Sequence, residues 1–154
     1  MRFWDWALSA YDKPGAAEAC LILQDHFEQN VPVLLWAAWN AQTGRRPDED
    51  TLEAACDMAR AYDRVVVAPL RQMRRTLKSP VPDIETEHRE ALRTQVKALE
   101  LEAERRLMLE LETLSPEPSG APRRPIEGLA ETARLWASVV PRPALTTLSE
   151  RLSA

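Results

Sequence analysis

Cysteine, histidine and glycine are scarce in this chain of 154 residues, which holds 2 Cys, 2 His and 4 Gly. Cys20 and Cys56 form no CxxC pair and have no histidine at ligand spacing, so we expect no metal site. So few glycines argue against a Gly-rich phosphate loop, and neither a P-loop nor a G-x-S-x-G motif is present. The sequence therefore predicts no cofactor and contains no recognisable catalytic motif.

Long apolar runs and an excess of basic charge are also lacking. The longest apolar run, 31–39, is far shorter than the roughly 20 residues of a membrane-spanning helix. The opening MRFWDWALSA lacks the apolar core of a secretory signal, so we expect a cytoplasmic protein with reduced thiols. The net charge of −4 gives no general attraction to nucleic acids or anionic membranes.

Good helix formers dominate the composition, and the alternation of apolar and polar residues that is typical of β-strands never extends beyond three residues. The pattern predicts an all-α fold: a compact helical bundle with one long helix and a less regular C-terminal helical pair. The expected helical stretches are 3–11, 14–29, 31–42, 50–78, about 84–114, 126–139 and 144–152. We expect Asn30, Asp50 and Asp83 to cap the helices that follow them, and Pro69 to kink the chain between 62 and 69.

Proline spacing suggests how the chain is divided. Residues 1–114 are expected to form a single helical domain, and 115–125, with four prolines and a glycine, a flexible or extended linker. Residues 126–154 form a C-terminal helical segment, either docked or mobile. A straight helix over 84–114 is about 46 Å long, against a domain diameter near 40 Å, so it spans the domain or projects from it.

Aromatic residues near the N-terminus define a first candidate site. Tryptophans 4, 6, 36 and 39 lie among apolar neighbours, which favours core packing over a stacking platform. Asp5 and Ser9, on the short polar stripe of the first helix, could accept hydrogen bonds from indole N–H groups, and so could a backbone carbonyl. The alternative is a pocket for a small ligand, and its residues would be Trp4, Asp5, Trp6, Asp25, His26 and Trp39.

A basic stripe defines a second candidate site. Arg71, Arg74, Arg75 and Lys78 share one face of a helix and could bind an acidic partner or a phosphate. The alternative is a solvated face, or pairing with the acid-rich helix over 85–112. On the long helix, Leu101, Met108 and Leu109 add apolar surface beside the main stripe, which suggests a second contact within the chain or with another copy.

The N-terminal two-thirds of the chain resembles a family of uncharacterised bacterial proteins, a domain of unknown function. The family opening looks like FWxWAxxxYxxxGxxxACLxLQD followed by NVxLLLW, against FWDWALSAYDKPGAAEACLILQD at 3–25 and NVPVLLW at 30–36 here. The blocks at 65–78 and 92–105 are similar as well. One departure is FEQ at 27–29, where a glycine is expected in the turn before Asn30. The resemblance implies no activity, cofactor or site residue.

These patterns lead to one main hypothesis for function. We expect a non-enzymatic protein-interaction or regulatory protein that uses the basic face at 71–78 and the long helix, with self-association through the apolar residues of that helix. The alternative is a small-ligand-binding protein or enzyme using the aromatic pocket. A weaker alternative is RNA binding by the basic face, and binding to a membrane is not expected.

Overall fold

The computed structural model describes residues 1–154 and consists of helices without strands, so the predicted all-α class is confirmed. Eight α-helices and one π-helical segment follow each other along the chain. They are α1 (Phe3–Tyr11), α2 (Ala16–Phe27), α3 (Val31–Gln42), α4 (Glu49–Tyr62), η1 (Asp63–Val67), α5 (Ala68–Thr76), α6 (Thr86–Leu114), α7 (Pro125–Trp136) and α8 (Arg142–Ser153).

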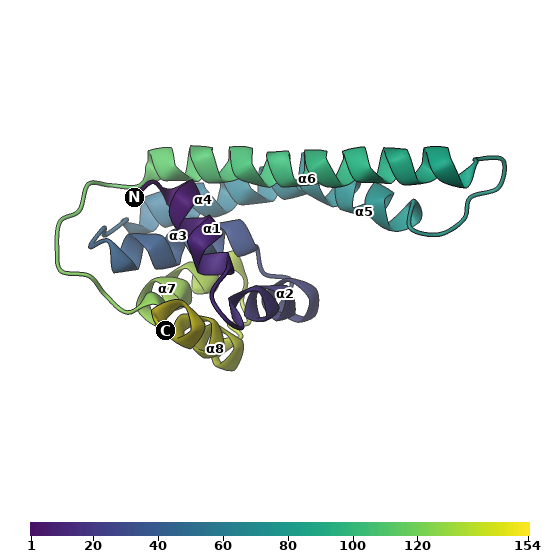
Figure 1. Ribbon diagram of the computed structural model, residues 1–154. Helices are drawn as coiled ribbons and strands as arrows, with labels where there is room; N and C mark the ends of the chain where they lie inside the picture. Colours follow the sequence, from purple (N-terminus) through teal and green to yellow (C-terminus); the bar gives the residue numbers. More distant parts are fainter.

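The longest helix, α6, lies along one side of the molecule and extends beyond it (Figure 1). Its C-terminal part packs on the bundle, where Leu107 and Leu111 are fully buried. Its N-terminal part is accompanied only by α5, so the pair forms a projecting arm (Figure 1). The apolar stripe predicted along the whole helix therefore leaves Leu92 and Leu99 half exposed on this arm.

The central helix of the bundle is α3, in which every residue from Pro32 to Ala41 is buried. Its closest neighbour is α7, and the two backbones approach each other at Gly128. A methyl group added at Gly128 would lie 2.5 Å from the carbonyl oxygen of Ala37, so only glycine fits this crossing without a shift of the backbones.

The C-terminal helices contribute to the same core as the rest of the chain. Leu129 from α7 and Leu145, Leu148 and Leu152 from α8 belong to the single apolar cluster built around α3. The proline-rich stretch is extended and held to the end of α3, because the amide of Arg123 donates to the carbonyl of Ala41 at 2.7 Å. The division into a 1–114 domain and a separate segment stays a prediction.

Two of the three expected helix caps differ in the structure. Asn30 does cap α3, accepting a hydrogen bond from the amide of Val33 at 3.0 Å. Asp48, not Asp50, caps α4, because its side chain reaches the third amide of the helix, that of Thr51. The cap position of α6 is Glu85, which makes no side-chain cap bond; Asp83 instead adopts a left-handed conformation in the preceding turn.

The break expected around Pro69 takes the form of one π-helical turn. Residues 63–67 widen to π geometry between α4 and α5, and Pro69 falls in the first turn of α5. A proline there needs no backbone donor, and the wider turn before it accommodates the ring. The chain therefore stays helical from α4 through η1 into α5, and only the helical pitch changes over residues 63–67.

The departure from the family pattern at 27–29 falls on a strained turn. The second helix ends at Phe27, two residues earlier than predicted, because Glu28 adopts a left-handed conformation with a φ of 53°. Glycine adopts the left-handed conformation without steric cost, whereas residues with a side chain adopt it rarely. The expected glycine therefore corresponds to a real backbone requirement, which this chain meets with glutamate.

Candidate functional site

A cavity of about 530 Å³ opens where α1, α2, α5 and α6 meet beside the start of α3. Apolar side chains line most of it, with Leu35 and Met108 at its base. Its size falls in the range of about 300–1,000 Å³ that is usual for ligand pockets. Residues of α1 and α2 and residues of α5 and α6 contribute to its lining.

Large apolar side chains from three helices are left exposed around the opening. Leu8 and Tyr11 of α1, Leu21 of α2 and Leu101 of α6 all line the cavity, and each is 40–58% exposed. These side chains leave one side of α1 uncovered by the rest of the chain. Only Phe3, Ala7 and Ala10 of that helix are buried.

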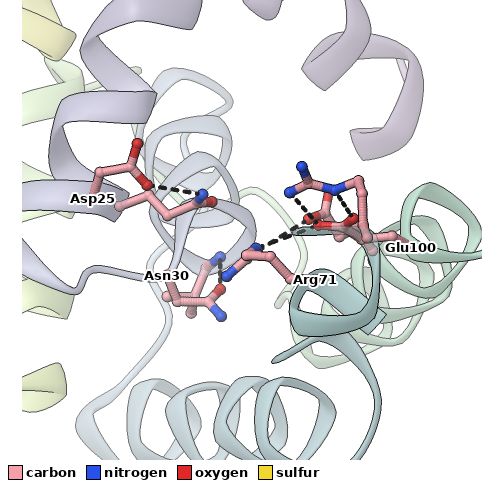
Figure 2. Close-up of polar contacts among 8 residues, drawn as sticks. Asp25, Asn30, Arg71 and Glu100 are labelled. Atoms are coloured by element: carbon pink, nitrogen blue, oxygen red, sulfur yellow. Dashed lines mark hydrogen bonds and ion pairs between the residues drawn. The ribbon is translucent and has the colours of Figure 1, made fainter. Parts of the chain in front are cut away.

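An ion-pair network between α5 and α6 forms the polar part of the cavity lining. Glu100 of α6 is buried and accepts hydrogen bonds from Arg71 Nε at 3.3 Å and Arg74 Nε at 2.7 Å, both from α5. Figure 2 shows Arg71 directed toward Glu100, with Asn30 and Asp25 on its other side. The hydrogen bond that Arg74 donates to Glu100 raises the pKa of Arg74, so this guanidinium stays charged.

A second carboxylate, Glu104, lies one turn further along α6 and also lines the cavity. Its nearest cation is Arg71, whose Nη2 is 3.7 Å from Glu104 Oε1, beyond hydrogen-bond distance. Burial raises the pKa of Glu104, and the charge of Glu100 acts in the same direction, whereas Arg71 and Arg74 act against it. Burial also raises the pKa of Tyr11, with smaller contributions from Cys20 and Glu104.

The six residues of the predicted aromatic pocket do not gather at one place. Trp4 lines the cavity, whereas Trp39 is buried in the core against Phe3, with ring centroids 5.4 Å apart. Trp6 donates its indole N–H to Gln42 at 3.2 Å. The remaining three, Asp5, Asp25 and His26, are exposed. The partner that we suggested for an indole N–H, Asp5 or Ser9, is thus not the one Trp6 uses.

The predicted basic face is divided between two environments. Arg71 and Arg74 turn toward α6 and pair with Glu100, which is the pairing that the sequence offered as an alternative. Arg75 and Lys78 are exposed.

The predicted apolar residues of α6 are also divided. Leu101 and Met108 both line the cavity, although Met108 is itself buried, and Leu109 is partly buried outside the cavity. Sequence reasoning missed Glu100, Glu104, Leu8, Tyr11 and Leu21. The signal for Glu104 was available, because the 101, 104 and 108 positions follow helical spacing and share one face of α6.

Potential metal ligands do not cluster in the structure, and both thiols are buried. No three His, Cys, Asp or Glu side chains are arranged to hold a metal ion. Both cysteines are buried and unpaired, and burial raises the pKa of Cys20 to about 12 and that of Cys56 to about 11. A thiol held protonated in this way is a poor nucleophile. None of the helices combines the length and apolar character needed to cross a membrane.

Comparison with known proteins places the chain in a family without a described activity. No curated protein and no solved structure matches it. One family model matches residues 2–111, a range that includes α1 to α5 and most of α6 and therefore the whole lining of the cavity. The chain belongs to this family, which is described as "Protein of unknown function (DUF2390)".

Proposed function

We propose that this chain is a non-enzymatic, cytoplasmic protein-interaction module, and that the cavity between α1, α2, α5 and α6 is its recognition site. The partner inserts an apolar side chain into the cavity and covers the apolar residues around its opening. This proposal keeps the long helix and part of the basic stripe from the sequence-based hypothesis. The proposed partner binds at the cavity beside the basic stripe, and not on the outer face of the stripe.

One observation carries the proposal: Leu8, Tyr11, Leu21 and Leu101 converge on one opening from three different helices. Single exposed apolar residues are normal on a protein surface, but a contiguous group around a hollow is typical of a binding site. Binding energy at interfaces concentrates where an apolar anchor fills such a hollow. The cavity provides the hollow, and the four side chains provide its rim.

Affinity capture with two matched leucine variants tests this function. Leu101→Glu places a charge at the rim of the cavity, whereas Leu92→Glu places the same charge on the same helix, away from the cavity. The two leucines are 58% and 50% exposed, so neither substitution removes a buried contact. We expect wild type and Leu92→Glu to retain a protein that Leu101→Glu loses, with at least a tenfold change in quantitative mass spectrometry.

The comparison has a clear adverse outcome. If the three proteins capture the same partners in the same amounts, the cavity is not the interaction site. Light scattering on the same samples shows whether the captured partner is a second copy of this chain. A monomer at high concentration that Leu101→Glu does not alter would exclude self-association through this residue.

A second candidate function is binding of a small molecule in the same cavity. The observation in its favour is the volume of about 530 Å³, which suits a small organic ligand. A thermal-shift screen separates the two functions, since a small ligand raises the unfolding temperature of the isolated chain and a protein-binding surface without its partner does not. RNA binding is disfavoured, because Arg71 and Arg74 are engaged by Glu100.

A further inference from the structure

The charged side chains that line the cavity differ in whether they have hydrogen-bond partners. Two guanidiniums, Arg71 and Arg74, face three carboxylates, Asp12, Glu100 and Glu104. Both guanidiniums donate hydrogen bonds to Glu100. The carboxylates of Asp12 and Glu104 accept no hydrogen bond, and the cation nearest to Glu104 is Arg71, whose Nη2 lies 3.7 Å from Glu104 Oε1. The charged groups of the cavity that still lack a hydrogen-bond partner are therefore carboxylates, which carry negative charge.

Glu104 is the better placed of these two carboxylates. It lies between Leu101 and Met108 on the face of α6 that lines the cavity, whereas Asp12 is exposed at the end of α1. Burial raises the pKa of Glu104 and so disfavours its charged form, and Arg71 only partly offsets this effect. A cation that entered the cavity would replace lost hydration with a direct hydrogen bond, which is stronger in a desolvated site.

Aromatic rings of the same cavity add to this preference. Trp4 and Tyr11 project from α1 into the lining. Ring faces attract ammonium and guanidinium groups, and Trp4 already has the Arg105 guanidinium 5.9 Å from its ring centroid. The leucines of the rim match an aliphatic stem. An apolar stem with a positive end therefore complements both the apolar and the acidic side chains of the lining.

We infer that the cavity accepts a lysine side chain of the partner segment, with the aliphatic stem between Leu8 and Leu101 and the ammonium group at Glu104. The inference rests on the proposed function, since it names the chemistry of the partner at the same site. A free alkylamine has the same chemistry, and the experiment below separates the two sources. An anionic group is disfavoured, because both guanidiniums are already engaged by Glu100.

Two ligand series test the inference by calorimetry. The first is a capped pentapeptide with two leucines on each side of a central lysine, norleucine or glutamate. The second is octylammonium, octanol and octanoate. We expect the lysine peptide to bind about tenfold more tightly than the norleucine peptide, the increment of one charge-assisted hydrogen bond, and the glutamate peptide to bind least.

Variants of the wall give a second, independent readout. Glu104→Gln should remove the advantage of lysine over norleucine, measured as the ratio of the two dissociation constants for the same variant. Glu102→Gln, on the same helix but outside the cavity lining, should leave both peptides unchanged. The advantage of lysine over norleucine in wild type does not depend on how any variant folds.

The possible outcomes distinguish a failure of the inference from a failure of the proposed function. Norleucine or glutamate peptides that bind as tightly as the lysine peptide overturn the inference, while the cavity remains a binding site. Octylammonium binding without peptide binding also overturns it, in favour of a free amine. If no probe binds, the inference fails; if Leu101→Glu also captures the same partners as wild type, the proposed function fails as well.

Discussion

At the scale of single residues, the cavity wall depends on how one buried carboxylate is satisfied. Glu100 has a side chain only 12% exposed and accepts hydrogen bonds from two arginines of a neighbouring helix. Burying a charge is costly unless it is paired, and this pairing uses Arg71 and Arg74, two of the four residues of the predicted basic stripe. The same two bonds hold α5 against α6 at the base of the arm.

We predict that Glu100→Ala destabilises the protein by about 1–3 kcal/mol, because it leaves two partly buried guanidiniums without their acceptor. Urea unfolding followed by circular dichroism measures this change. The control is Glu102→Ala on the same helix, whose pairs with Arg105 and Arg106 are exposed. Such pairs contribute about 0.5 kcal/mol or less. Equal losses from the two substitutions would show that the Glu100 network has no special role.

At the scale of elements, helix ends decide where the cavity lies. The turn after α2 sets the direction in which α3 enters the core, and it depends on Glu28 in a left-handed conformation. The indole N–H of Trp136 donates to the carbonyl of this residue at 3.0 Å, so the turn is also fixed from the α7 side.

We predict that Glu28→Gly stabilises the protein by about 0.5–1 kcal/mol, since glycine adopts a φ of 53° without the steric cost that a side chain bears. The net gain is limited by the larger entropy of glycine in the unfolded chain. Thermal and urea unfolding measure it. Glu28→Ala is the matched control, because it removes the carboxylate but keeps the steric cost. A glycine variant no more stable than the alanine variant contradicts the backbone explanation.

Much of this element pattern was predictable from sequence, and the remainder has identifiable physical reasons. Helical periodicity and the Asn30 cap located α3, and Pro69 located the π-helical turn. Caps such as Asp48 and Asp50 lie two residues apart and share the same chemistry, so sequence alone cannot choose between them. Periodicity also describes an apolar stripe without showing what covers it, which is why the projecting half of α6 was not separated from its buried half.

At the scale of the whole molecule, the candidate site combines residues from both sites predicted from sequence. Trp4 came from the aromatic pocket, and Arg71, Arg74, Leu101 and Met108 came from the basic stripe and the long helix. Their meeting depends on how four helices cross, which no local pattern encodes. Residues of α5 and α6 line one part of the cavity, and α6, about 43 Å long at 1.5 Å per residue, extends past the bundle (Figure 1).

Photo-crosslinking in the native cells tests the central claim most directly. A photoreactive amino acid replaces Leu101 at the rim of the cavity or, as the control, Leu92 on the exposed part of the same helix. The account predicts a defined crosslinked partner from position 101, absent from position 92 and lost when Glu104→Lys is added. Crosslinks of equal yield from both positions, or none from position 101, would contradict the cavity as the site of interaction.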